Sequence, residues 1–153
     1  FGAFVDPGAQ LFDDAMDQVE RAKKAILLVS GVAALKYGPK IQDEQEVLSW
    51  LADMTIDTFA LESSVLRARK IEARGDDASL VKGYVDVLIA RTATRLLDAG
   101  SQALAHTSEG DDLRVQLAGL KRFAKVPEAI DTASVRRKTA TTLVEAGGYA
   151  VTP

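Results

Sequence analysis

Three carboxylates and one imidazole are the side chains of this 153-residue sequence whose spacing suggests acid–base or metal chemistry. Asp53, Asp57 and Glu62 fall within one helical segment, where residues three or four positions apart share a face. Helical bundles hold paired metal ions with Glu residues and Glu-x-x-His pairs, but His106, the single histidine, belongs to no such pair. The chain has no Cys, which excludes thiolate metal sites, disulfides and cysteine nucleophiles. We therefore predict no metal site.

The carboxylates are better explained as structural groups. Asp53 and Asp57 flank the apolar rows of their helix, so we expect both on a solvated face. Glu62 lies closer to the apolar face. We expect it to form an interhelical ion pair with Arg91 or Arg95 rather than to act as a general acid.

Nucleophilic and cofactor chemistry have little support in the sequence. Ser63 and Ser64 have no nearby base, and the chain contains no nucleophile elbow. The glycines show neither GxGxxG nor Walker spacing, so no phosphate cradle is expected. We predict no catalytic, cofactor-binding or metal-binding residue within the chain. An independent helical enzyme that uses His106 or Glu62 is the weakest alternative.

A basic segment indicates a different possible function, the docking of an anionic surface. Residues 120–138 contain six basic and two acidic residues, a local charge of +4, whereas residues 76–112 contain three basic and seven acidic residues, a local charge of −4. The basic residues are Lys121, Arg122, Lys125, Arg136, Arg137 and Lys138. They suit either a docking surface for anionic lipid or an acidic partner, or a solvated helix face whose charge the acidic segment balances.

Hydrophobic spacing predicts the elements that carry these residues. We expect helices at about 9–37, 43–73, 79–105, 112–125 and 132–146, with apolar residues recurring three and four positions apart. Asp6 and Pro7 suit the start of the first helix, and Gly38-Pro39 its end. Asp43 followed by Glu46 resembles a capping box. Residues 106–112, HTSEGDD, are predicted as a loop, and residues 1–8 as a linker.

The second predicted helix has two apolar rows, which together favour packing between two neighbours. The first row is Val47, Leu51, Met54, Thr58, Leu61 and Val65, and the adjoining row is Leu48, Thr55, Phe59 and Leu66. Short turns at 38–42 and 75–78 make consecutive helices antiparallel neighbours. Gly83 and Gly100, inside the third helix, can let a neighbouring backbone approach. The sequence therefore predicts one all-α, up-and-down bundle of four to five helices, three of them long.

Composition and charge exclude several classes of protein. A hydrophobic fraction of 47% with a net charge of −3 excludes a disordered chain and gives no global attraction to nucleic acid. The start FGAFVDPG lacks the features of a signal peptide, and Phe1 in place of Met indicates processing or a segment of a longer chain. The apolar run from Ala25 to Leu35 has eleven residues, whereas a bilayer span needs about 20. We expect a cytoplasmic protein, with association at a membrane surface as the alternative.

One block of sequence points to a family. Residues 43–70, DEQEVLSWLADMTIDTFALESSVLRARK, together with KYGPKI before them and VEAGGYAVTP near the end, resemble the C-terminal extension of very-long-chain-type acyl-CoA dehydrogenases. The shared pattern is an acidic-Gln start, then LAD, then ID with an aromatic residue and Ala, then a stretch rich in Leu and Arg. The similarity extends over nearly the whole chain from about Leu11.

The resemblance implies a parent flavoenzyme that takes two hydrogens from the α and β carbons of an acyl-CoA in fatty-acid β-oxidation. FAD accepts the hydride and a Glu base takes the α proton in that family, and these groups belong to a preceding dehydrogenase core. No catalytic position is therefore transferred to this chain, and FAD is expected in the parent alone. The implied partners are the core of the same chain and a second copy in a homodimer. The alternative is a membrane-surface or protein-docking module that uses residues 120–138.

Overall fold

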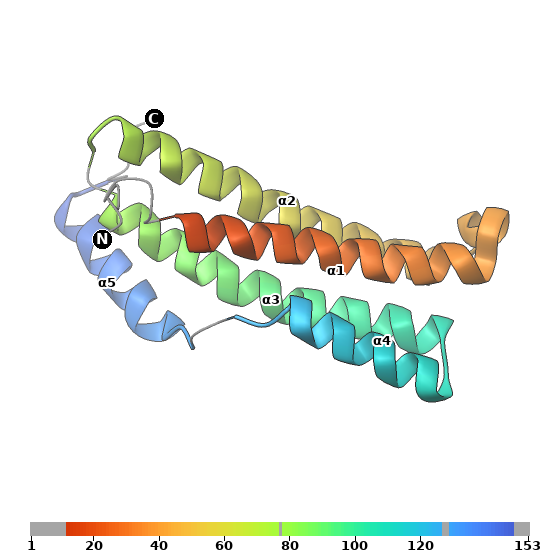
Figure 1. The fold of residues 1–153 in the computed structure, drawn as a ribbon. Helices are drawn as coiled ribbons and strands as arrows, with labels where there is room; N and C mark the ends of the chain where they lie inside the picture. The colour runs from red at the N-terminus through yellow and green to blue at the C-terminus, as the bar shows by residue number, and fades with distance from the viewer. Residues whose placement is uncertain (1–11, 77, 127–128, 149–153) are drawn as a thin grey trace, which may run out of the picture.

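The long helices predicted from hydrophobic spacing form the body of the protein in its computed structural model, which describes residues 12–76, 78–126 and 129–148. Within these residues the chain forms five α-helices and one short 3₁₀-helix (Figure 1). They are α1 (Asp13–Tyr37), η1 (Gly38–Asp43), α2 (Gln45–Ala73), α3 (Ser79–Thr107), α4 (Gly110–Phe123) and α5 (Thr132–Glu145). The prediction of an all-α bundle with three long helices is confirmed.

Two helices organise the bundle. α1 contacts α2, α3 and α4, and α3 contacts α1, α2, α4 and α5. α2 lies on one side of the α1–α3 pair, while α4 and α5 lie on the other, and neither of them contacts α2 (Figure 1). Consecutive long helices are antiparallel neighbours, as the short turns between them predict.

The core divides into two clusters along the bundle axis. The first combines the beginning of α1 with the second half of α2 and the first half of α3; its buried members include Phe12, Val19, Leu61, Val65 and Val85. The second combines the rest of these helices with α4; its buried members include Val29, Met54, Leu96, Leu104 and Leu120. Both consist of residues that the helical periodicity assigns to inward faces.

The glycines of α3 mark close approaches to the shorter helices, and the groups that approach them are side chains rather than the predicted backbone. A Cβ placed on Gly100 would lie 2.9 Å from both methyl groups of Leu120 in α4. A Cβ on Gly83 would lie 3.3 Å from Val135 and 3.4 Å from the Thr139 hydroxyl in α5. The missing side chains thus set how closely α4 and α5 pack on α3.

The prediction that α2 packs between two neighbours is confirmed, since α2 contacts α1 and α3, but its second apolar row does not join the core. The first row is inward, with Val47, Met54, Thr58, Leu61 and Val65 all buried. In the adjoining row Phe59 is 69% exposed, Leu66 is 47% exposed, and Thr55 also faces solvent. The physical reason is the arrangement of the bundle, since α4 and α5 pack on α1 and α3 and leave the outer side of α2 uncovered.

Two predicted boundaries are corrected. Asp43 does not cap α2: it ends η1, and Glu44 precedes α2 without a side-chain cap hydrogen bond. Residues 106–112 are not a loop, because α3 continues to Thr107 and α4 begins at Gly110.

The first described residue of the α1 region is Phe12, so the predicted start near Ala9, the Asp6-Pro7 cap and the 1–8 linker lie outside the described residues.

Candidate functional site

Glu62 forms an ion pair with α1 rather than with α3. Lys23 Nζ donates a hydrogen bond of 2.7 Å to Glu62 Oε1, and a second one of 3.1 Å to Glu20 Oε1 on its own helix. These hydrogen bonds, the one to Glu62 first, hold the pKa of the Lys23 ammonium above its usual value. The expected pairing of Glu62 with Arg91 or Arg95 is therefore wrong, although its structural role in an interhelical pair is confirmed.

Arg95 instead binds Asp57. Its Nε donates to Asp57 Oδ2 across the α2–α3 contact, and the Asp57 side chain is only 13% exposed. That hydrogen bond is the main cause of a raised pKa at Arg95, to which the charges of Asp53 and Asp98 add. The expectation of a solvated face is correct for Asp53, which is exposed, and wrong for Asp57. Both interhelical carboxylates are therefore neutralised by a cation on a neighbouring helix.

His106 lies in the last turn of α3, at the end of the bundle where α1 meets α2. Its Nε2 is 3.5 Å from Glu44 Oε2, and its ring meets the Trp50 ring edge-on with centroids 6.0 Å apart. Lys36 Nζ donates to the backbone carbonyl oxygen of His106 at 3.0 Å. Among the described residues the ring contacts of His106 are a carboxylate and an indole, neither of which is a serine, threonine or cysteine nucleophile. The cluster ties three helix ends together.

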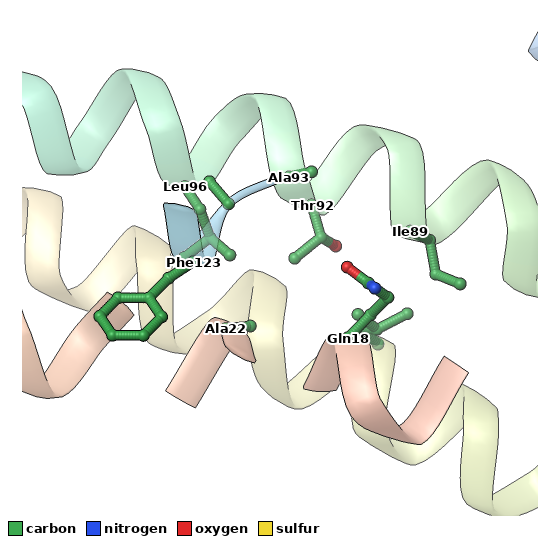
Figure 2. Close-up of a pocket in the computed structure, with 9 residues that line it drawn as sticks. Gln18, Ala22, Ile89, Thr92, Ala93, Leu96 and Phe123 are labelled. Atoms are coloured by element: carbon green, nitrogen blue, oxygen red, sulfur yellow. The ribbon is translucent and has the colours of Figure 1, made fainter. Parts of the chain in front are cut away.

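The cavity in Figure 2 lies where α1, α2 and α3 meet the end of α4. Its volume of about 10 Å³ is close to the minimum that one water molecule needs. Figure 2 shows the Gln18 amide and the Thr92 hydroxyl pointing toward one another, with Phe123 and Leu96 at the other end. The cavity can hold a water molecule, but not a substrate or a cofactor.

Two larger hollows open at the surface. One, of about 440 Å³, lies between α1, α3 and the side chains of Val126, Ala129 and Ile130, and its charged residues are Asp14, Lys82 and Asp86. The other, of about 430 Å³, lies between α3 and α5 and combines apolar side chains with Tyr84 and Arg136. Each hollow has a single cation in its lining, Lys82 in the first and Arg136 in the second, rather than the cluster of cations that suits a dinucleotide pyrophosphate. Neither hollow therefore fits FAD, and no flavin contact is assigned to its residues.

The basic residues of the 120–138 segment all face solvent. Lys121 and Arg122 lie in the last turn of α4, Lys125 follows it, and Arg136, Arg137 and Lys138 lie in α5. α4 and α5 do not contact one another, so the two groups are carried by separate helices. Among the described residues, no cluster of His and carboxylate groups suits a metal ion, and no helix has the length and hydropathy to cross a bilayer.

Comparison with known proteins places the chain in a family. The family model for the acyl-CoA dehydrogenase C-terminal domain matches residues 21–122, about two thirds of the chain. The chain belongs to this family. The matched region runs from the third turn of α1 to the last turn of α4 and contains the whole of α2 and α3.

Individual relatives of this acyl-CoA dehydrogenase C-terminal domain extend the match to nearly its full length. It is 32% identical over 148 residues to a probable acyl-CoA dehydrogenase of Bacillus subtilis (strain 168), an alignment that covers 95% of this chain and 25% of the relative. A crystal structure of an acyl-CoA dehydrogenase from Bacillus anthracis, complexed with FAD, matches with a TM-score of 0.88 and 26% identity. That match covers 99% of this chain and 25% of the other. The chain spans about a quarter of the length of both proteins.

Sequence reasoning missed two features of the α1 and α2 helices. It did not assign Lys23 to Glu62, although a Lys on the face of α1 that follows the acidic turns was available as a signal. It also did not recognise that the exposed side of α2 is almost free of charge. The uncharged row Thr55, Phe59 and Leu66 is the available signal, although its spacing alone predicts core.

Proposed function

We propose that this chain is the non-catalytic helical C-terminal domain of an FAD-dependent acyl-CoA dehydrogenase and packs on a dehydrogenase core of the same polypeptide. The observation that carries the proposal is the pair of coverages: nearly all of this chain aligns with only a quarter of two acyl-CoA dehydrogenases. The remaining three quarters of each relative provide room for a separate catalytic core. The ion-paired carboxylates of α2 suit a supporting role.

The chemistry of the parent enzyme falls outside the chain in this proposal. The α proton of the acyl-CoA passes to a carboxylate base and the β hydride passes to FAD, which leaves an α,β double bond. The residues of this chain hold their helices together: Lys23 holds Glu62, and Arg95 holds Asp57. They neither bind the thioester nor receive its proton.

Finer properties of the parent form part of the proposal. The residue 43–70 block supports the very-long-chain type, for which the parent's kcat/KM should rise with the length of the acyl chain. We also propose a homodimeric, cytoplasmic parent in which this domain supports dimerisation. Light scattering by the parent protein and fractionation of its host cells test these two properties.

The direct test of the proposed function is a comparison of the parent protein with this chain alone. The parent should carry flavin and reduce an electron acceptor in the presence of an acyl-CoA, whereas the 153-residue chain should do neither. Saturable FAD binding by the chain alone, seen as a visible flavin spectrum in stoichiometric amount, would overturn the proposal.

A second candidate function is supported by the exposure of all six basic residues of the 120–138 segment. In this alternative, α4 and α5 bring the domain to an anionic lipid surface or an acidic partner. The two functions are compatible in a longer protein. The basic helices lie on the side of the bundle away from α2, so a surface bound there would leave the α2 side free to pack on a core (Figure 1).

A further inference from the structure

The solvent-facing side of α2 departs from what an exposed amphipathic helix normally presents. Every exposed position from Ser49 to Leu66 is uncharged except Asp53. Ile56 is 64% exposed and Phe59 is 69% exposed. The outer faces of α1 and α5 carry the usual charged residues over much of their length, such as Asp14, Asp17, Lys24, Arg136, Arg137 and Lys138. α2 therefore exposes a surface of the kind that proteins bury.

α1 continues this surface across the groove between the two helices. The Lys23–Glu62 ion pair places these residues at the same level of two antiparallel helices. One turn further along, Leu27 follows Lys23 and Phe59 precedes Glu62, so these two apolar side chains also lie at one level. Leu27 is 70% exposed, and α1 carries no charge from Ala25 to Leu35. We call Leu27, Ile56, Phe59 and Leu66 the α1–α2 face.

No described element covers the α1–α2 face. α3 packs on the inner side of α1 and α2, and neither α4 nor α5 contacts α2 (Figure 1). Contiguous exposed apolar surface marks an interaction site, whereas single exposed apolar residues need no explanation. Leu27, Ile56 and Phe59 occupy neighbouring turns of two adjacent helices, so they form one surface rather than scattered exposures. Leu66 lies two turns beyond Phe59 on the same side of α2, with the exposed Ser63 between them.

We propose that the α1–α2 face is the surface on which the dehydrogenase core of the same polypeptide packs. This inference rests on the proposed function and names the contact that it requires. The chain spans a quarter of each matched relative, so a partner three times its length is covalently attached to it in those proteins. Attachment keeps that partner at a high effective concentration. A permanently covered interface is hydrophobic and resembles a domain core cut in half. The α1–α2 face has this character, because it is nearly free of charge.

The absence of Cys from the chain allows a chemical test in the full-length parent. Leu27→Cys and Phe59→Cys place a thiol on the face, while Val115→Cys and Val144→Cys place one at positions 67% and 80% exposed on α4 and α5. All four replace exposed side chains and leave the core intact. Labelling of each thiol by a maleimide is followed by peptide mass, which separates it from any thiol of the parent core.

The thiols at positions 27 and 59 should label roughly tenfold or more slowly than those at 115 and 144 in the folded parent, and all four at similar rates in urea. Fast labelling at 27 and 59 with slow labelling at 115 or 144 overturns the assignment of the face but keeps a packed domain. Fast labelling at all four positions overturns the packing in the proposed function as well. Protection that appears only at high protein concentration, or only with anionic vesicles, overturns the core as occupant in favour of a second copy or a membrane.

Discussion

Thr58 lies on the inner side of α2, 4% exposed, with a hydroxyl that has no hydrogen-bond partner. An unsatisfied buried hydroxyl loses its hydration without compensation. We expect Thr58→Val to raise the free energy of unfolding by about 1 kcal/mol, because valine keeps the shape and β-branching of threonine and removes the polar atom. Urea denaturation followed by circular dichroism measures the change.

Thr107 provides the matched control. It is also buried in a helix, but its hydroxyl donates to the carbonyl oxygens of Ala103 at 2.8 Å and Leu104 at 3.1 Å. Thr107→Val removes these hydrogen bonds and should leave stability unchanged or lower it. An equal gain in both variants would show that the orphaned hydroxyl of Thr58 is not the cause.

Gly100 and Gly31 make a second pair of residues that differ in surroundings alone. Both lie inside helices, where Ala is intrinsically favoured by about 1 kcal/mol. A Cβ at Gly31 meets nothing within 4 Å, whereas a Cβ at Gly100 meets the fully buried Leu120. Gly31→Ala should therefore stabilise the protein, and Gly100→Ala should destabilise it by about 1–3 kcal/mol through overpacking. Thermal unfolding of the two variants measures both stability changes. Stabilisation by Gly100→Ala would contradict the close approach of α4.

The sequence predicts that Glu62 forms an ion pair between helices, but it does not predict which cation is the partner. Glu62 needs a cation because it borders the apolar face, and that much follows from its spacing. Whether the cation lies on α1 or on α3 depends on the rotation of α2 in the bundle, which directs Glu62 toward Lys23 and Asp57 toward Arg95. Rotation is set by the packing of all three helices together, so no local pattern specifies it.

At the scale of elements, α5 depends on its first-turn cap. Asp131 Oδ1 accepts hydrogen bonds from the backbone N–H groups of Ala133 and Ser134, and Oδ2 accepts one from the Ser134 hydroxyl. The Ser134 hydroxyl, followed by the two N–H groups, holds the pKa of Asp131 below its usual value. A depressed folded-state pKa gives stability that is present above the unfolded pKa, about 4 for Asp, and is lost as pH falls through the folded value.

Asp131→Ala should consequently increase amide exchange in α5 at neutral pH, because the first N–H groups lose their acceptor. The difference from wild type should shrink as the pH falls below about 4. Asp131→Asn keeps a side-chain oxygen that does not titrate, and its protection of α5 should vary less with pH. A difference between Asp131→Ala and wild type that stays constant through acid pH would contradict the role of the ionised cap.

The exposed cations of α4 and α5 give a further prediction at this scale. If the docking alternative holds, the parent should co-sediment with anionic vesicles, and conversion of Lys121, Arg122, Arg136 and Arg137 to Glu should abolish binding. Salt should weaken it, because screening acts on exposed charges. Binding that survives the charge reversal would exclude this basic segment as its cause, and neutral vesicles provide the control.

Element identity followed from the sequence, whereas element ends did not. The three- and four-residue recurrence of apolar residues located all five helices within a few positions. The polar segment 106–112 suggested a loop, but burial of Leu104 and Thr107 extends α3, and Gly110 at φ +60° lets α4 begin after only two intervening residues. Acidic residues in the first turn of α4 are favoured by the helix dipole, so they belong to the helix start.

At the scale of the whole molecule, the arrangement of helices decides which apolar rows become core. Phe59 and Leu66 have the spacing of core residues, and no feature of α2 alone distinguishes them from Leu61 and Val65. Their exposure follows from the position of α4 and α5 on the far side of the bundle (Figure 1). A helix that exposes large apolar side chains on a side that no described element covers indicates a further partner, here the proposed dehydrogenase core.

The central claim is that this domain supports the parent dehydrogenase without taking part in its chemistry. His106 and Glu62 are the two side chains that catalysis by this chain would use in the independent-enzyme alternative. The measurement is therefore kcat and kcat/KM for acyl-CoA oxidation by the parent protein carrying His106→Ala and Glu62→Gln together. We predict values close to those of wild type. A fall in kcat of about 100-fold or more, the effect of removing a general acid or base, would contradict the account.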